Sequence, residues 1–301
     1  MHIFPLQAIL FAILLIQFCL LPVSAIQVTD DFGNEVVLSS TVKRIVTLAP
    51  YLTELVYSAG AGDQLIATVS YSDYPEASNK LPSIGDANGI DIEAIVKLEP
   101  DLVISWHSGN GAAIANNLSR LGITVFESEP DSIEKISSTI SRIGKLTGTE
   151  QIAKNNIQEF INEIEILRSQ YSNQKKVSVF YQFWNKPVYT IGGLHLISKH
   201  IELCGGENIF ADQKTLSLNT DMESIIIRNP AIIIASGNDN QRPLWLDEWK
   251  EWRNIEAVRN NNLHHIPPDL IQRHTIRVTQ GIKYLCEVMD IARQKQPVIT
   301  D

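Results

Sequence analysis

Two segments of the chain, 91–104 and 221–234, carry nearly the same pattern of residues. Each begins Asp-apolar-Glu, reaches a proline and ends in an apolar run, and the copies lie 130 residues apart without a gap. An acidic start, a proline stop and an apolar run indicate a helix followed by a buried strand. A spacing of that length is typical of domains rather than of solenoid repeats. The pattern predicts two similar lobes, each presenting one glutamate, Glu93 or Glu223, at the start of a helix. The alternative is a chance likeness between two ordinary helix–strand units.

The composition is that of a soluble globular protein. The chain has 301 residues, enough for two domains with separate cores, and 44% of them are hydrophobic and 20% charged. The formal net charge is −9, and no block is rich in Lys or Arg. Because binding to phosphates needs clustered cations, this balance argues against nucleic acid as a partner.

The first 25 residues differ from the rest of the chain. Residues 3–21 are almost wholly apolar, and 23–25 read Val-Ser-Ala, which matches a small-residue cleavage site. We expect a signal peptide over 1–25 that is cleaved on export, although its start lacks Lys and Arg. A retained membrane anchor is the alternative, because the apolar run approaches the length that spans a bilayer.

Short apolar strands alternate with helices along the rest of the chain, which predicts an α/β fold with mainly parallel sheets. Residues 149–171 have apolar positions at helical spacing and contain no Gly or Pro. A helix of this extent is about 34 Å long and forms a rigid connection. We expect an N-terminal lobe over 26–147, a connecting helix over 148–172 and a C-terminal lobe over 173–301. The strands are expected at 44–49, 65–69, 101–106, 123–126, 177–182 and 263–266, and further helices near 53, 112–121, 245–252 and 276–292.

Cleavage of the leader removes Cys19 and leaves two cysteines, Cys204 and Cys286. An even pair in an exported protein is a candidate disulfide, and the alternative is two buried free thiols. The chain contains no Cys-x-x-Cys, so a zinc knuckle or a redox motif of that type is not expected.

Aromatic residues gather where the expected strands end. In open α/β sheets, ligands bind beyond the carboxyl ends of the strands. Aromatic faces with one acidic–basic pair suit a large, partly apolar ligand that carries amide or similar polar groups. The candidate ligand-binding residues are Pro50, Tyr51, Tyr71, Trp106, Phe183, Trp184, Tyr189, Asp269 and Arg273.

The chain resembles the class III periplasmic substrate-binding proteins of ABC importers, from about residue 44 to about residue 289. Within that class it is most similar to the members that bind cobalamin. The resemblance implies two α/β lobes joined by one long helix. The most specific stretches are 53–55, 71–75, 100–104, 106–110, 182–183 and 204–210.

Several roles follow from the resemblance alone. Tyr71 and Trp106 match pocket aromatics of the first lobe, and Phe183 and Tyr189 match those of the second, where Tyr189 replaces a Phe. Asp269 and Arg273 match a polar pair that reaches the corrin side chains. Glu93 and Glu223 match glutamates that dock into arginine pockets on the two halves of a permease dimer at the inner membrane. Cys204 and Cys286 match the family disulfide.

The resemblance also implies a periplasmic protein, monomeric when free, with no cofactor of its own and with cobalamin or a related corrinoid as its transported ligand. Two pocket tryptophans of the family fall at Ala87 and Ser217 here. Because two large apolar faces are missing, haem or a ferric siderophore remains an alternative ligand. Tyr51 and Trp184 are extra aromatics that stand in neighbouring loops.

Two other kinds of function were weighed. A metal-ion carrier needs about four converging ligands, and His107, His195 and His274 lie near the expected loops without a close-spaced pattern. His107 is a candidate to face the cobalt of a bound corrinoid. An exported enzyme is disfavoured because the chain lacks a Gly-x-Ser-x-Gly elbow, a Walker loop and a dinucleotide fingerprint.

Overall fold

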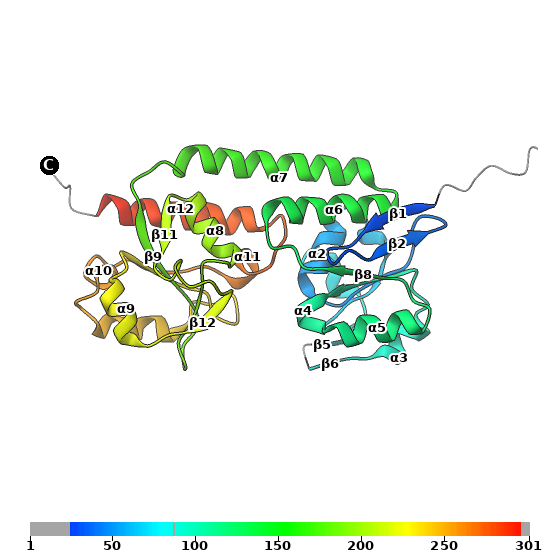
Figure 1. The fold of residues 1–301 in the computed structure, drawn as a ribbon, viewed down its shortest axis with the longest axis horizontal. Coiled ribbons are helices and arrows are strands. Elements are labelled where there is room, and N and C mark those ends of the chain that lie inside the picture. The colour runs from blue at the N-terminus through cyan, green and yellow to red at the C-terminus, as the bar shows by residue number, and fades with distance from the viewer. Residues whose placement is uncertain (1–24, 87, 296–301) are drawn as a thin grey trace, which may run out of the picture.

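The computed structural model describes residues 25–86 and 88–295. Almost all of the expected signal peptide, and Ala87, therefore lie outside the described residues. The described chain forms two lobes side by side, and one long helix, α7 (Glu150–Tyr171), runs across both of them (Figure 1). The expected connecting helix over 148–172 corresponds to α7 and the residues at its two ends.

The N-terminal lobe is built on a parallel sheet with the strand order β4-β3-β7-β8. Two small antiparallel hairpins, β1–β2 and β5–β6, flank this sheet. The strands are β1 (Ile26–Thr29), β2 (Glu35–Leu38), β3 (Ile45–Thr47), β4 (Leu65–Ala67), β5 (Gly85–Asp86), β6 (Gly89–Ile90), β7 (Leu102–Trp106) and β8 (Val125–Ser128). The helices are α2 (Pro50–Ser58), η1 (Gly62–Gln64), η2 (Glu76–Lys80), α3 (Ile92–Lys97), α4 (His107–Asn110), α5 (Ala112–Arg120) and α6 (Ile133–Thr147).

The C-terminal lobe has a mixed sheet with the order β12-β10-β9-β13-β14, and β11 also pairs with β9. Strands β9, β11, β13 and β14 pair in parallel, whereas β10 runs antiparallel to both of its neighbours. Its strands are β9 (Val177–Trp184), β10 (Tyr189–Ile191), β11 (Gly206–Asn208), β12 (Ser217–Asn219), β13 (Ile232–Ala235) and β14 (Leu263–His265). Its helices are α8 (Leu196–Leu203), α9 (Met222–Arg228), η3 (Leu244–Glu251), α10 (Glu256–Arg259), α11 (Pro268–Ile271) and α12 (Val278–Gln294).

The repeated segments fold alike. Asp91 and Asp221 cap helices α3 and α9, and each side chain accepts a hydrogen bond from the backbone N–H three residues later, at 2.9 and 2.7 Å. The two helices also stop alike, because Glu99 and Asn229 both have positive φ, +45° and +40°, just before a proline. The apolar runs then become β7 and β13. The sequence repeat is thus a repeat of structure, down to the backbone conformation at the end of each helix.

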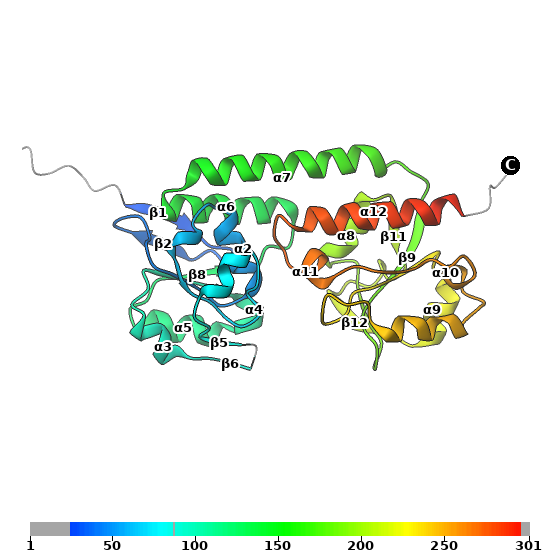
Figure 2. The same ribbon diagram turned by 180° about the vertical axis from the view of Figure 1, so that it is seen from behind.

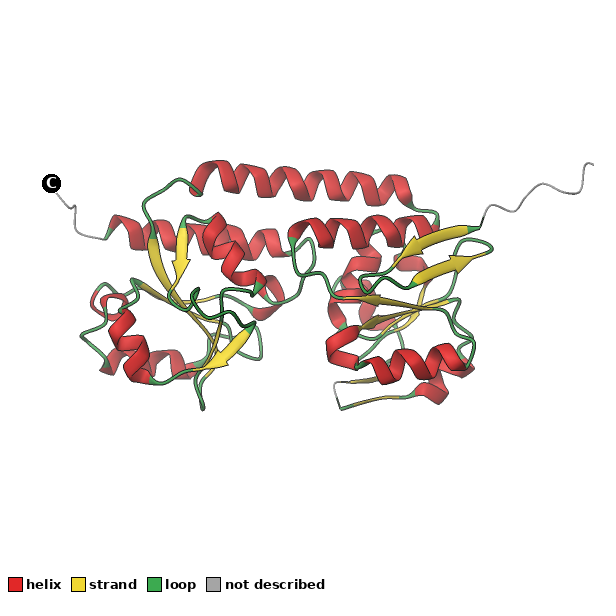
Figure 3. Ribbon diagram, in the orientation of Figure 1, coloured by secondary structure: helices red, strands yellow, loops and turns green. Residues whose placement is uncertain are grey.

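The long helices join the lobes into one body. Helix α6 begins at a serine cap, where Ser132 accepts from the backbone N–H of Lys135, and ends at Gly148 with φ +75°. Beneath α7, helices α6 and α12 lie one after the other, as Figures 2 and 3 show. Phe160 and Ile164 of α7 are 2% and 1% exposed.

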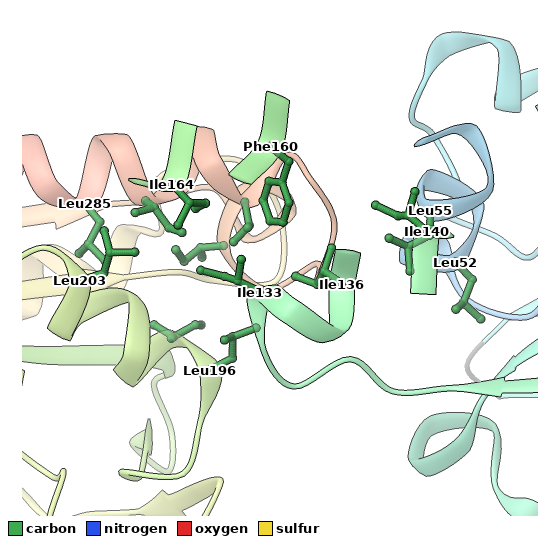
Figure 4. Packing of buried hydrophobic residues seen from close by; sticks show 14 of the residues in the cluster. Leu52, Leu55, Ile133, Ile136, Ile140, Phe160, Ile164, Leu196, Leu203 and Leu285 are labelled. Carbon is green, nitrogen blue, oxygen red and sulfur yellow. The ribbon is translucent and has the colours of Figure 1, made fainter. Parts of the chain in front are cut away.

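One hydrophobic cluster therefore runs from the N-terminal lobe to the C-terminal lobe (Figure 4). It joins α2, α6, α7, α8 and α12 through side chains that include Leu52, Leu55, Ile140, Leu196 and Leu285. A continuous apolar core opposes wide separation of the lobes, because separation would expose buried surface at about 25 cal/mol per Å².

Three sequence predictions differ from the structure in detail. Helix α2 begins at Pro50 rather than near Thr53, because proline fits the first turn of a helix, where its missing N–H is not needed. The helix expected over 245–252 is a 3-10 helix, η3, which ends at Glu251, so Trp252 lies just after it. Phe183 and Trp184 do not follow β9 but end it, and Trp184 pairs with Tyr189 across a hairpin.

Candidate functional site

Trp106 stands at the point where strand β7 leaves the core. Residues 102–105 are fully buried, whereas Trp106 is 39% exposed. The backbone N–H of Trp106 donates to Oδ1 of Asn110 at 2.7 Å, and Nδ2 of Asn110 donates to the Leu48 carbonyl at 3.0 Å. The indole lies against Gly109, where an added Cβ would come within 1.9 Å of the ring. These contacts within residues 106–110 and with Leu48 therefore fix the indole at the carboxyl edge of the sheet.

The C-terminal lobe has a matching change from buried to exposed. Strand β9 is buried as far as Gln182, and Phe183 and Trp184 then emerge from the core. The rings of Phe183 and Tyr189 lie 5.9 Å apart between centroids. Gln182 is hydrogen-bonded at the point where β9 leaves the core. Its Oε1 accepts from the indole N–H of Trp249 at 2.8 Å, and its Nε2 donates to the Trp184 carbonyl at 3.1 Å.

Trp106 and Phe183, from opposite lobes, line the same cleft. The cleft has a volume of about 340 Å³, within the usual range for small-molecule sites. Two hollows adjoin it. One of about 710 Å³ shares Asp131, Leu194, Leu196 and Leu216 with the cleft, and one of about 550 Å³ shares Phe183. The cleft is lined by Trp106, Glu129, Pro130, Asp131, Tyr181, Phe183, Leu194, His195, Leu196, Ile197, Leu216, Ser217, Gln272 and His274.

Two histidines in the cleft wall present opposite hydrogen-bonding character. His195 caps α8, and its Nδ1 accepts from the Ile197 N–H at 3.1 Å, so the neutral ring carries its proton on Nε2. His274 Nδ1 donates to the Pro130 carbonyl at 2.6 Å, so its Nε2 is an acceptor. Burial, with a smaller effect of His274, lowers the pKa of His195 to about 4. Burial also lowers the pKa of His274, against the Pro130 hydrogen bond and the nearby Asp131 and Glu129. Both rings are therefore uncharged near neutral pH.

His107 is placed elsewhere. Its Nδ1 lies 2.8 Å from Oε1 of Glu127, and its ring stacks on Phe32 with centroids 3.7 Å apart. His107 is not among the residues that line the cleft. The structure thus gives no support to the expectation that His107 faces a bound metal centre, and His195 and His274 are the histidines of the cleft wall.

Asp269 and Arg273 form an ion pair at 2.8 Å, and this pair belongs to a larger polar cluster between the lobes. Arg273 also contacts Glu54 at 3.0 Å, Asp73 at 2.8 Å and the Tyr71 carbonyl at 3.2 Å, all in the N-terminal lobe. Tyr71 is 80% exposed and has φ +66°, and the strained backbone directs its carbonyl to the guanidinium.

Other candidate residues support the site or lie beside it. Pro50 begins α2, and Tyr51 packs edge-on against Trp106 with centroids 6.1 Å apart. The Tyr51 hydroxyl donates to the Ser128 carbonyl at 2.8 Å. Burial, together with the charge of Glu129, raises the pKa of Tyr51 well above its usual value. Tyr51 therefore holds Trp106 in place rather than lining the cleft, and Trp184 lines the adjoining 550 Å³ hollow.

Sequence reasoning missed part of the cleft wall. Glu129, Pro130 and Asp131 directly follow β8, so the rule that ligands bind at the carboxyl ends of strands could have found them. Gln272 and His274 flank Arg273 and had no such signal. Ser217 does line the cleft, so the absence of a tryptophan there leaves open space in the wall.

Glu93 and Glu223 occupy equivalent surface positions. Each is the second residue of its helix, solvent-exposed, in the first turn of α3 or α9. Helices α3 and α9 both lie on the face opposite α7, one in each lobe (Figures 1 and 2). The two helices that carry these exposed glutamates thus lie on one side of the molecule.

The structure contains the disulfide between Cys204 and Cys286, with a Cα–Cα distance of 4.7 Å. It joins the end of α8 to α12. Within residues 25–86 and 88–295, no helix is long and apolar enough to cross a membrane. In the same ranges, no three or more His, Cys, Asp or Glu side chains are placed to share a metal ion.

Two α/β lobes, one helical strut and a partly apolar cleft between the lobes define a bilobal ligand-binding protein. The model of the periplasmic binding protein family matches residues 45–270, and the chain belongs to this family.

Its relatives include proteins named for vitamin B12. The chain is 35% identical over 270 residues to the vitamin B12-binding protein of Vibrio campbellii, a match that covers 88% of this chain and 96% of the relative. It is 34% identical over 251 residues to that of Yersinia pestis, covering 82% and 86%. The crystal structure of the periplasmic vitamin B12-binding protein BtuF of Vibrio cholerae matches with a TM-score of 0.77 at 31% identity, covering 85% of this chain and 99% of that one.

Proposed function

We propose that this protein captures cobalamin or a related corrinoid between its lobes and delivers it unchanged to the permease of an ABC importer. The observation that carries this proposal is the pair Trp106 and Phe183, which face one cleft from opposite lobes. The names of the relatives support the choice of ligand. Family membership and the expected signal peptide support a place in the periplasm.

The geometry of the cleft suits a large, flat ligand. Aromatic side chains offer wide apolar faces at low conformational cost, and two adjoining hollows continue the 340 Å³ cleft beyond its wall. Around the apolar faces, His195 donates, His274 accepts, and Gln272 offers its amide oxygen, since its amide nitrogen donates to Tyr181 and Ser236. This combination complements amide side chains on a ligand.

Haem and ferric siderophores are the alternative ligands. Solved structures that share the fold include the haem-binding protein RhuT of Roseiflexus, which matches with a TM-score of 0.73 at 19% identity. A likeness at that identity supports the fold but does not select the ligand. The cobalamin proposal rests instead on the relatives with 31–35% identity and on the aromatic pair.

Docking to the permease is proposed through Glu93 and Glu223. A permease dimer offers two equivalent basic sites, and two carboxylates in equivalent settings on one face can engage both and fix the orientation. Capture and delivery require no bond to be made or broken, so we propose a binding role without catalysis.

The experiment replaces Trp106 or Phe183 by alanine and measures the affinity for cyanocobalamin by calorimetry. Each replacement should weaken binding by about tenfold to a hundredfold, because burial of a large apolar side chain contributes about 1.5–3 kcal/mol. Trp252→Ala is the matched control, since Trp252 is also 39% exposed but does not line the cleft. Unchanged affinity in both cleft variants would place the ligand elsewhere.

A further inference from the structure

A short segment of the C-terminal lobe, residues 272–277 between α11 and α12, is held by the N-terminal lobe. Arg273, Thr275 and Arg277 all donate hydrogen bonds to Glu54, which lies in α2. Gln272 and His274, the two neighbours of Arg273 in the chain, line the cleft. The segment therefore connects these hydrogen bonds between the lobes to the wall of the ligand site.

Glu54 is the buried acceptor of all three hydrogen bonds. It is 3% exposed, and its Oε1 accepts from Arg273 and Arg277, each at 3.0 Å, while its Oε2 accepts from Thr275 Oγ1 at 2.9 Å. Burial raises the pKa of Glu54, although Arg277, Arg273 and Thr275 oppose this shift. The largely buried Arg277 pairs with Glu54 and lies over the Tyr74 ring, 3.8 Å from its centroid. Removing the charge of Glu54 would leave the Arg277 charge without its carboxylate partner.

The Arg273 guanidinium has four acceptors within the protein. Nη1 contacts Glu54 and Asp73, and Nη2 contacts Asp269 and the Tyr71 carbonyl. The Arg273 side chain is 15% exposed. A ligand that accepts a hydrogen bond from Nη1 or Nη2 of Arg273 must therefore replace one of these acceptors, because the four Nη hydrogens already have four acceptors.

The exposure of the three carboxylates decides which acceptor leaves first. The Glu54 side chain is 2% exposed and that of Asp269 is 16% exposed, whereas that of Asp73 is 50% exposed. Ion pairs that water reaches contribute little to stability, while breaking a buried pair is costly. Asp73 also lies in the opposite lobe from Arg273, so its release frees a donor at the junction between the lobes.

We propose that Glu54 is a positioning residue that holds Arg273 beside the cleft, and that Asp73 occupies the same guanidinium until a ligand displaces it. This inference rests on the proposed function, because it needs a ligand with hydrogen-bond acceptors in the cleft. Two opposite effects follow. Loss of the Asp73 charge removes a competitor, and loss of the Glu54 charge removes the anchor.

The test is a titration with cyanocobalamin at fixed pH and ionic strength, comparing wild type with Asp73→Asn and Glu54→Gln. Asp73→Asn should bind roughly two- to five-fold more tightly, because the fraction of molecules with a free guanidinium rises by about the strength of one exposed ion pair. Glu54→Gln should bind on the order of tenfold more weakly, as one expects when a buried charge pair that orders a binding group is broken.

The controls make the same chemical changes away from this contact between lobes. Asp212→Asn removes an exposed carboxylate paired with Arg228, and Glu127→Gln alters a carboxylate that is 14% exposed and contacts its own lobe. Both controls should bind as wild type does. Thermal unfolding of each variant establishes that it is folded. If Glu54→Gln does not fold, Glu54→Asp takes its place, because its shorter side chain withdraws the carboxylate from Arg273, and it should also bind more weakly.

The outcomes separate the two claims. Tighter binding by Asp73→Asn with weaker binding by Glu54→Gln supports the inference. Affinity that is unchanged or reduced in Asp73→Asn overturns the role of Asp73 as a competitor, and unchanged affinity in Glu54→Gln overturns the anchor. A wild-type protein that does not bind cyanocobalamin overturns the proposed function and this inference with it.

Discussion

His200 lies in α8, fully buried, and neither of its ring nitrogens has a hydrogen-bond partner within the described residues. Burial, with smaller effects of His274 and His195, lowers the pKa of His200 to about 3. Above pH 6.5 the ring is neutral in both the folded and the unfolded chain. As the pH falls below 6.5, His200 is protonated in the unfolded chain but not in the folded protein. The free energy of unfolding therefore decreases until the pH reaches the folded pKa of about 3.

We predict that His200→Leu makes the protein less sensitive to acid. Between pH 6 and pH 4, one such histidine costs about 1.4 kcal/mol of stability per pH unit, and the variant should lack that share of the slope. At pH 7.5 it should be at least as stable as wild type, because a buried polar ring without partners is replaced by an apolar side chain. Urea unfolding across this pH range measures the slope. An unchanged slope would mean that His200 does not contribute to it.

The sequence predicted single residues unevenly, for physical reasons. Trp106 and Phe183 were predictable, because an aromatic residue directly after a buried apolar run emerges at the carboxyl edge of a sheet. Tyr51 was misplaced, because Pro50 begins a helix and turns the ring under Trp106. The hydrogen-bonding character of His274 depends on Pro130, 144 residues away, and no local pattern encodes such a contact.

At the scale of elements, the disulfide ties α8 to α12 across 82 residues of chain. Helix α12 packs on both α7 and α8, and both cysteines are fully buried, so the linkage lies within the helical layer. The disulfide thus closes a loop that contains most of the C-terminal sheet.

We predict that the double variant Cys204→Ser and Cys286→Ser is less stable by about 2–4 kcal/mol, because the unfolded chain loses a cross-link and gains conformational freedom. Chemical denaturation of the variant and of wild type, with and without reductant, measures the difference. Reductant should destabilise wild type but leave the variant unaffected. Equal stability of the two proteins would contradict a structural role for the linkage.

Elements were predictable where periodicity was strong and long. The expected helix over 149–171 is α7, which the structure assigns to 150–171, because 22 residues without Gly or Pro leave no competing break. The β9–β10 hairpin was not foreseen, since its turn over 185–188 contains no Asn-Gly or Asp-Gly and its register shifts between Tyr189 and Thr190. The tryptophans at 245, 249 and 252 follow helical spacing, yet residues 244–251 adopt the tighter 3-10 form and Trp252 lies just after it.

At the scale of the whole molecule, the 130-residue repeat places two carboxylates on one face, while the cleft lies between the lobes. If Glu93 and Glu223 dock to a permease, then ligand capture and docking use different residues on different parts of the surface. The exposed setting of both residues is consistent with this separation, because neither lines the cleft.

We therefore predict that Glu93→Lys combined with Glu223→Lys abolishes uptake while leaving ligand affinity unchanged. Uptake of labelled cyanocobalamin is measured in cells where this protein and its permease provide the only route. The matched control is Glu150→Lys with Glu159→Lys, which makes the same charge change on exposed positions of α7, on the opposite face. Uptake that survives in the double docking variant, at the level of the control, would refute the assignment.

The most direct test of the central claim is a titration of the purified chain, without residues 1–25, with cyanocobalamin, cobinamide, haem and a ferric siderophore. We predict one binding site per molecule, filled by a corrinoid in preference to haem and the siderophore. Binding of haem or the siderophore while neither corrinoid binds would contradict the proposed ligand, although the bilobal binding fold would stand.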